Sequence, residues 1–167
     1  MTFHTPLHAE LAALLPRLRR FARSITFHRE DADDLVQIAL ERAMNRSAQY
    51  EPGTRLDSWM FRIIKNGWID EVRARARREQ VFAPEEEGEH VGDDSASAHQ
   101  QRMAIHKAMS LLSDDHRIVI GLVLVDGLPY KEAAAVLDIP LGTLMSRLAR
   151  AREALQGLLS DQARNMA

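Results

Sequence analysis

Arginine and hydroxyl side chains recur at helical spacing near the C-terminus of this chain. At about 100° per residue, one stripe of the helical wheel is apolar and contains Leu144, Leu148, Ala151 and Leu155. The opposite face is expected to carry Thr143, Ser146, Arg147 and Arg150. Arginine can bind guanine edges or phosphates, and serine and threonine can donate to either. This pattern predicts a DNA-recognition helix; the alternative is the solvated face of an ordinary surface helix.

A proline-marked turn is expected to position that helix. Lys131 to Leu137 is rich in helix formers, and Asp138-Ile139-Pro140 ends it because proline lacks a backbone donor and disfavours helix in the preceding residue. A second helix is expected to start near Gly142-Thr143. Two short helices around a tight turn are typical of a helix-turn-helix. The apolar segment 117–125 is expected to form the buried centre of this domain.

A second candidate for nucleic-acid binding is the helix predicted over 56–78. Its apolar stripe contains Met60, Phe61, Ile64, Trp68 and Val72. The far side carries Trp59 and Ile69 together with the polar residues Arg62, Lys65, Asn66, Arg73 and Arg77. Cations that hold phosphates beside a flat ring that stacks on a base suit single-stranded or melted DNA. Alternatively, Trp59 packs against a neighbouring helix and the cations are only solvated.

Acidic residues crowd the start of another predicted helix, over 31–46. Asp31, Asp33 and Asp34 follow Glu30 within its first turn, and Gln37 comes one turn later. Acids are favoured there by the helix macrodipole, so part of the cluster is explained by capping. A magnesium site is the alternative, since carboxylates bind that ion. No second acidic cluster lies in an obvious matching motif, and we expect no metal and no cofactor.

Composition and charge divide the chain of 167 residues into three parts. Residues 1–80 carry a balance of +3 and residues 102–167 a balance of +1, whereas 81–101 holds six acids and no Lys or Arg. That middle segment is poor in large apolar side chains and is expected to be a flexible acidic linker. Strand signals are scarce, and a further helix is predicted over 7–24. The predicted fold is all-α, with two small helical domains, 1–80 and 102–167, the second a helix-turn-helix.

Several classes of protein are disfavoured by the composition. There are no cysteines, so disulfides and thiolate metal sites are excluded. No segment has the apolar length of a transmembrane helix, and the first twenty residues lack the apolar stretch and cleavage site of a signal peptide. We therefore expect a cytoplasmic protein. Motifs for a phosphate loop or a serine nucleophile are also missing from the sequence, which argues against an enzyme.

The C-terminal segment resembles the fourth conserved region of bacterial extracytoplasmic-function (ECF) sigma factors, which are initiation factors of RNA polymerase. The matching residues are Gly127, Tyr130, Glu132, Ala133, Pro140, Gly142, Thr143, Ser146, Arg147, Arg150, Ala151 and Arg152. Met145 stands where the family often has a basic residue. The resemblance implies that this domain reads the −35 promoter element as duplex, through Thr143, Met145, Ser146, Arg147 and Arg150.

The N-terminal half resembles the second conserved region of the same family, through Trp59, Arg62, Ile63, Asn66, Asp70 and Arg73. This resemblance implies capture of melted −10 DNA by the loop over 45–55 and the helix after it. The residues assigned to that role are Tyr50, Trp59, Arg62, Lys65, Asn66 and Arg73. The segment 31–37 resembles the part that docks on core polymerase, which implies contacts from Asp31, Asp33, Asp34 and Gln37.

The function implied by both resemblances is binding rather than catalysis. The partners implied are core RNA polymerase, promoter DNA and an anti-sigma factor, and the regulated genes would serve a stress or envelope response. In the family the linker threads through the polymerase, so the acidic segment is either a plain tether or a mimic of nucleic acid. Two rival functions remain: a sigma-like module that binds an anti-sigma factor without touching promoters, and a small metal-dependent enzyme built on the acids at 30–34.

Overall fold

The structure is a computed structural model that describes residues 5–78 and 96–166. Within them every regular element is helical, which confirms the predicted all-α class. Residues 81–95 of the predicted linker lie outside this described part, so its role as a tether stays a prediction. The remainder of that linker differs from the expectation: α4 begins at Ala96, so 96–101 is helical. Alanines and glutamines in this short stretch favour helix, which explains the earlier start.

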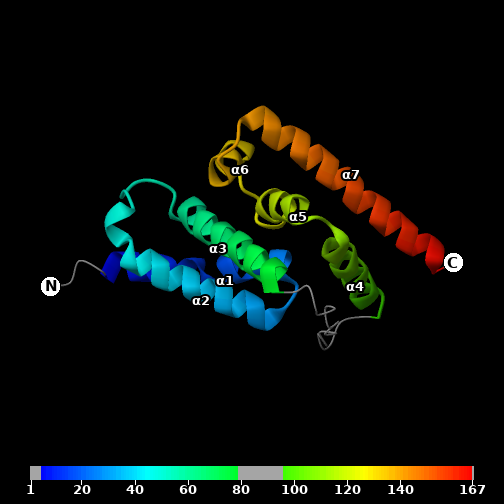
Figure 1. The fold of residues 1–167 in the computed structure, drawn as a ribbon, viewed down its shortest axis with the longest axis horizontal. Helices are drawn as coiled ribbons and strands as arrows, with labels where there is room; N and C mark the ends of the chain where they lie inside the picture. The colour runs from blue at the N-terminus through cyan, green and yellow to red at the C-terminus, as the bar shows by residue number, and fades with distance from the viewer. Residues whose placement is uncertain (1–4, 79–95, 167) are drawn as a thin grey trace.

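The N-terminal lobe, residues 5–78, is a bundle of three long helices. They are α1 (Thr5–Thr26), α2 (Arg29–Asn45) and α3 (Leu56–Arg78), with a short 3₁₀ turn, η1 (Ser47–Gln49), between the last two. Phe27 joins α1 to α2 in a left-handed conformation, with φ of 64°. The predicted apolar stripe of α3 faces inward as expected, because Met60, Phe61, Ile64 and Trp68 are buried. Figure 1 shows these three helices side by side.

The C-terminal lobe, residues 96–166, contains α4 (Ala96–Leu111), α5 (Asp114–Ile120), α6 (Tyr130–Leu137) and α7 (Leu141–Asn165). Ser113 caps α5 by accepting a hydrogen bond from the backbone N–H of His116 at 3.3 Å. Asp138 ends α6 in the left-handed conformation, and α7 begins directly after Pro140. The pair α6–α7 is the predicted helix-turn-helix.

The sequence predicted that the apolar segment 117–125 forms a buried helix. The structure differs, because this segment is neither one uniform helix nor buried throughout. After α5 the chain widens into a π-helical turn, η2 (Gly121–Val125). Leu122 and Val123 are buried, but Leu124 is 43% exposed. A π-helical turn is wider than an α-helical turn, so it changes which side chains face the core. In this segment Leu124 faces solvent although it belongs to the apolar run.

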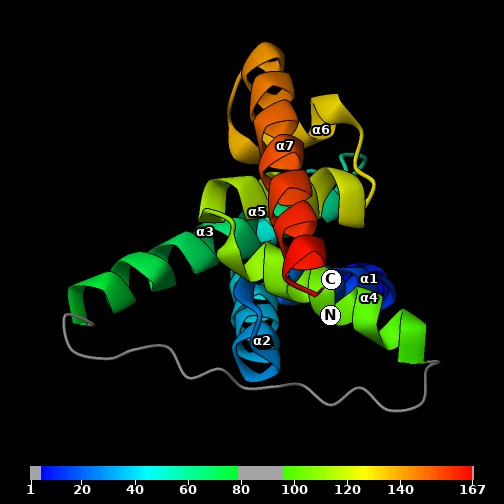
Figure 2. The same cartoon turned by 90° about the vertical axis from the view of Figure 1, so that its right-hand side faces the viewer.

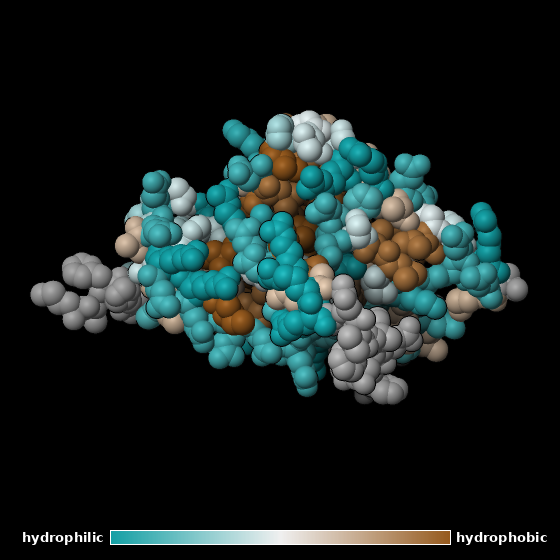
Figure 3. Space-filling view, in the orientation of Figure 1, coloured by the Kyte–Doolittle hydropathy of each residue, from teal (hydrophilic) through white to brown (hydrophobic). Residues whose placement is uncertain are grey.

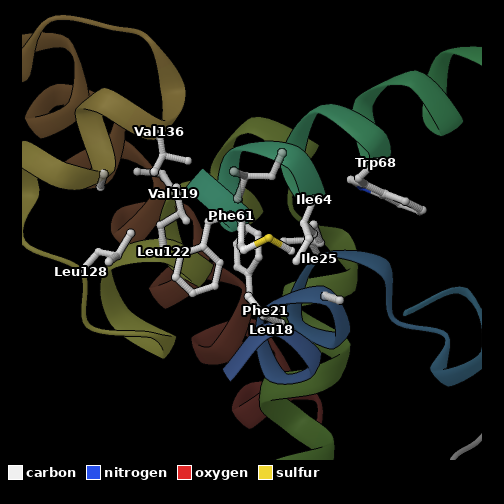
Figure 4. Packing of buried hydrophobic residues seen from close by; sticks show 14 of the residues in the cluster. Leu18, Phe21, Ile25, Phe61, Ile64, Trp68, Val119, Leu122, Leu128 and Val136 are labelled. Carbon is white, nitrogen blue, oxygen red and sulfur yellow. The ribbon is translucent and has the colours of Figure 1, made fainter. Parts of the chain in front are cut away.

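One continuous hydrophobic core joins the two lobes. Figure 4 shows Phe21 of α1 and Phe61 of α3 meeting Val119, Leu122 and Val136 of the C-terminal lobe. The two phenylalanine rings pack edge to face, with centroids 5.0 Å apart. The predicted pair of small domains therefore forms a closed body in which α1 and α3 lie against α5, η2 and α6. None of the helices described in either lobe is long and apolar enough to cross a membrane.

Candidate nucleic-acid and polymerase interfaces

The first helical turns of α7 present the predicted DNA-reading face. Leu144, Leu148 and Ala151 are buried against the rest of the C-terminal lobe, and they fix the rotation of the helix. The opposite face is open, with exposed side chains at Thr143, Met145, Ser146 and Arg150. The Arg150 guanidinium donates to the carbonyl oxygen of Ser146 at 3.3 Å. The front of α7 is thus polar and accessible along one edge.

Arg147 occupies a different position from the one predicted. It is half-buried and lies on the flank of the apolar stripe rather than opposite it. At about 100° per residue it stands roughly 60° from Leu144, so its aliphatic stem follows the edge of the buried stripe. A long side chain in this position can keep its guanidinium in solvent while its stem is packed.

Tyr50 and Trp59 form an aromatic pair at the loop before α3. Their ring centroids are 5.3 Å apart, and both side chains are half-buried. The Tyr50 hydroxyl donates to the carbonyl oxygen of Thr54 at 3.1 Å. Burial raises the pKa of Tyr50, and the negative charge of Glu10 adds to this. Trp59 therefore packs against a neighbouring side chain, which was the alternative to an exposed ring that stacks on a base.

The basic face of α3 contacts the C-terminal lobe at one end. Arg62 donates to the carbonyl oxygen of Ala135 in α6. Burial lowers the pKa of Lys65, the charge of Arg62 adds to this, and Asp138 opposes it. Asn66 and Arg73 are exposed, and Figure 2 shows the C-terminal end of α3 projecting away from α6 and α7. Among these four predicted −10 residues, Arg62 is thus exposed while it contacts α6, Lys65 is half-buried, and Asn66 and Arg73 are open.

The acidic start of α2 also divides into two kinds of residue. Asp31 pairs with Arg75 of α3 at 2.9 Å, and Arg75 in turn bonds Glu71 and lies over the ring of Trp68. Asp33, Asp34 and Gln37 are exposed on the outer face of the helix. Among residues 5–78 and 96–166, no three histidine or acidic side chains are grouped so that they could hold a metal ion.

A groove between α1 and α2 adjoins these acids. It is lined by Leu15, Arg19, Arg23, Arg29, Asp33, Val36, Gln37 and Leu40. Asp33 and Gln37 therefore border a surface that mixes arginines with aliphatic side chains. A surface of this composition suits protein contact, since it offers both apolar area and hydrogen-bond donors.

A second groove lies on the C-terminal lobe, between α4–α5 and α7. Figure 3 shows hydrophobic side chains gathered beside these helices on a face that is otherwise mostly hydrophilic. The lining residues include Leu111, Leu112, Ala154, Gly157 and Leu158, with Glu153 and Asp161 at the rim. Leu111 is 61% exposed, which leaves apolar surface open to a partner.

Arg17 is the centre of an ion-pair cluster that the sequence did not reveal. Its Nη2 atom lies 2.7 Å from Asp126 and 3.0 Å from Asp57. Arg55 also binds Asp57, through two contacts of 2.8 and 3.1 Å. Burial by itself would raise the pKa of Asp57, but the hydrogen bonds from Arg55, Arg17 and the Ser58 N–H hold it below its usual value. The three charges Arg17, Asp57 and Asp126 are far apart in sequence, and no periodic pattern marks them.

Arg117 is a second residue that sequence reasoning missed. It is buried, and its guanidinium donates to the carbonyl oxygens of Met109, Ser110, Leu112 and Ile25 and to the carboxylate of Asp114. It also lies over the ring of Phe27 at 4.5 Å. Burial lowers the pKa of Arg117, and the charge of Asp114 opposes this. The signal available in the sequence was a single arginine in an apolar segment. A charge in such a segment is expected to be buried, and a buried charge needs several hydrogen-bond partners.

The structure is that of a two-lobed helical protein with two candidate binding surfaces. The C-terminal lobe exposes the polar front of a helix-turn-helix, and the N-terminal lobe presents the acidic helix α2 and the basic, aromatic helix α3. Comparison with protein-family models gives the same division. Residues 11–78 match the model of Sigma-70 region 2, and residues 102–155 match that of Sigma-70, region 4.

Curated relatives specify the family further. The chain is 33% identical over 153 residues to the ECF RNA polymerase sigma factor EcfG of Rhodopseudomonas palustris, covering 92% of this chain and 84% of that protein. It is 31% identical over 137 residues to the ECF RNA polymerase sigma-E factor of Escherichia coli K12, covering 75% and 72%. The chain belongs to the ECF sigma factors of RNA polymerase, which are not enzymes in their own right.

Solved structures share the arrangement of both lobes. The sigma factor RpoE of Bartonella quintana, crystallised with the anti-sigma factor NepR, superposes with a TM-score of 0.82 at 34% identity. This match covers 93% of the present chain and 97% of that one. CnrH, in complex with the cytosolic domain of CnrY, gives a TM-score of 0.73 at 25% identity, with coverages of 96% and 91%.

Proposed function

We propose that this chain binds core RNA polymerase in the cytoplasm and directs it to a set of promoters. The observation that carries the proposal is the joint presence of both sigma regions with an open polar front on α7. A pure interaction module would have no need for Ser146 and Arg150 on that front. The proposed working domains are 1–80 and 102–167, and residues 96–101 of the segment between them extend α4 of the second domain.

The polymerase contacts are assigned to the N-terminal lobe. Asp33, Asp34 and Gln37 on the outer face of α2 make polar contacts with the polymerase, whereas Asp31 contributes by holding α2 to α3 through Arg75. The groove beside these residues enlarges the docking surface.

The DNA contacts are assigned to α3 and α7. Trp59 and Tyr50, with Arg62, Lys65, Asn66 and Arg73, receive the melted −10 element. Thr143, Met145, Ser146, Arg147 and Arg150 read the −35 element in the major groove, where hydroxyl and guanidinium groups can address base edges and phosphates. Neither of the two proposed DNA-binding faces has many cations, so binding to free DNA is expected to be weak and salt-sensitive.

An anti-sigma factor is the proposed regulator, in a stress or envelope response. Two structural relatives are seen with such partners: RpoE with NepR, and CnrH with CnrY. The open apolar groove beside α4 and α7 supports the proposal, since it leaves hydrophobic surface available to a protein partner.

Run-off transcription tests the function directly. The purified chain is added to bacterial core polymerase, and transcripts are sequenced from a genomic promoter library. New transcripts that start at a shared promoter sequence, and are missing with core polymerase alone, are the expected result. Failure of the chain to associate with core polymerase at low ionic strength, with no inhibitor present, would contradict the proposal. Association without any new transcript would favour the module that binds an anti-sigma factor alone.

A further inference from the structure

The start of α7 carries a row of apolar side chains beside its polar ones. Leu141, Met145 and Ala149 are spaced four residues apart, which places them along one line of the helix surface. Leu141 is 46% exposed, Met145 is 51% exposed, and Ala149 is exposed as well. This apolar row therefore lies outside the buried stripe of the helix and faces solvent in the free chain.

The surface beside the apolar row is open. A Cβ atom added to Gly142, three residues before Met145, would enter open space. In Figure 1 the start of α7 lies at the rim of the molecule, next to α6. A ligand can therefore reach Met145 without displacing another part of the chain.

Cations and a hydroxyl border the apolar row. Ser146 follows Met145 directly, and the Arg150 guanidinium is held near it by a hydrogen bond to the carbonyl oxygen of Ser146 at 3.3 Å. Arg152 is exposed two helical turns after Met145. The first twelve residues of α7, 141–152, contain three arginines and no acid. A border of this charge fits DNA, in which phosphates flank the base edges of a groove.

Met145 can read a base edge through apolar contact. Its thioether has no donor and is a weak acceptor, so it cannot make the paired hydrogen bonds by which arginine reads guanine. Thymine is the base that presents an apolar group, its C5-methyl, in the major groove. The unbranched methionine side chain adapts its shape to such a contact. Its chemistry therefore favours thymine over the other three bases.

The place of Met145 in the helix agrees with a base contact. In a helix-turn-helix the N-terminal residues of the second helix meet the base edges, and Met145 is the fifth residue of α7. The apolar row has two large side chains, Leu141 and Met145, and is bordered by cations. It is therefore a narrow strip rather than the broad apolar patch that is typical of a protein interface.

We propose that Met145, flanked by Leu141 and Ala149, makes recognition of the −35 element depend on the methyl group of a thymine at one fixed position. The apolar row packs on this C5-methyl, while Ser146 and Arg150 address neighbouring base edges or phosphates. The inference rests on the proposed reading of the −35 element by α7, and it deepens that proposal by naming a base. Promoters used by this chain then share an A·T pair at that position.

The test removes the methyl group alone. The full chain with core polymerase transcribes a promoter from the library, in which the −35 thymines of either strand are replaced one at a time by deoxyuridine. Deoxyuridine keeps every hydrogen-bonding group of thymidine and lacks the C5-methyl. The same templates are used with Met145→Ala, with the polar variant Met145→Gln and with the apolar variant Met145→Leu.

Met103→Ala on α4 is the matched control, because Met103 is a methionine of similar exposure, 54%, on another helix. Circular dichroism verifies that each variant is folded.

At one thymine, replacement by deoxyuridine is expected to reduce the transcript yield of the parent about fourfold, the factor typical for loss of one methyl-sized apolar contact. Met145→Ala and Met145→Gln should be weaker than the parent on the thymidine template and indifferent to the replacement, because the contact is already lost. Met145→Leu should keep the sensitivity to deoxyuridine. Met103→Ala should behave as the parent on every template.

A second arm omits the polymerase. The full chain at low salt selects from two pools of random duplexes, one synthesised with thymidine and one with deoxyuridine. The parent is expected to enrich a shared sequence more strongly from the thymidine pool, and Met145→Gln to draw equally on both. Thymine-dependent selection by a chain that does not associate with core polymerase would support the inference and contradict the proposed function.

Three results would overturn the inference. They are a shared −35 sequence without an A·T pair, a parent that is insensitive to deoxyuridine in both arms, and a penalty for deoxyuridine that persists in Met145→Gln. An insensitive parent that still directs transcription from specific promoters would leave the proposed function standing. A penalty that persists in Met145→Gln would assign the methyl contact to another residue.

Discussion

Arg62 of α3 donates a hydrogen bond to the carbonyl oxygen of Ala135 in α6, so a side chain assigned to melted DNA is held by the opposite lobe. This contact joins the lobe that matches Sigma-70 region 2 to the lobe that matches Sigma-70, region 4. The lobes that carry the proposed −10 and −35 surfaces are therefore in direct contact. A change in one lobe is expected to affect the other through this interface, and the predictions below separate local effects from coupled ones.

Arg147→Ala is expected to reduce transcription from −35-dependent promoters by about tenfold, since a lost base or phosphate contact of this type costs roughly 1–3 kcal/mol. Run-off transcription with core polymerase measures the effect. Polymerase binding should stay intact, because Arg147 lies on α7, away from α2. Arg164→Ala, on the exposed end of the same helix, is the matched control. Equal activity of Arg147→Ala and the parent would remove this residue from the −35 contact.

Asp34→Ala is expected to weaken holoenzyme assembly by about fivefold, as one polar contact is typically worth about 1 kcal/mol. Co-purification with core polymerase, or a binding titration with labelled chain, gives the measurement. The control is Glu41→Ala, which removes another exposed acid from α2 without touching the segment 31–37. Unchanged assembly for Asp34→Ala would argue against docking through this face.

Arg117→Met is expected to lower the free energy of unfolding by about 2–4 kcal/mol, because four carbonyl oxygens and one carboxylate lose their donor inside the protein. Urea denaturation followed by circular dichroism gives this value. Arg20→Met, at an exposed position, should change it by less than about 0.5 kcal/mol. A loss as small as that of the control would show that the buried network is not stabilising.

Acid is expected to weaken the Asp57 cluster. The pKa of Asp57 is lowered in the folded chain, so its contribution is present above the unfolded pKa of about 3.9 and is lost as pH falls through the lower folded value. Parent and Asp57→Asn should therefore differ most near pH 6 and converge toward pH 3. Urea unfolding across this range provides the comparison. A difference that grew as the pH fell would reverse the assigned sign.

Local patterns were sufficient to predict the helices and which face of α3 is buried. The stripe of Met60, Phe61 and Ile64 predicted which side of α3 is buried, and Pro140 predicted the start of α7 within one or two residues. Such signals are local, since periodicity and helix breakers act within a few residues. The placement of Arg147 opposite the apolar stripe was wrong, although its spacing from Leu144 was enough to put it on the flank of that stripe.

The sequence by itself determined an all-helical chain with a helix-turn-helix, a basic aromatic helix and an acidic helix, because each of these depends on side chains a few residues apart. Only the tertiary structure decided that the two lobes close on one another. An amphipathic helix specifies that one face is buried but not against which partner, and Arg17 meets Asp126 across 109 residues of chain. That contact depends on how whole helices pack, so no short stretch of sequence can encode it.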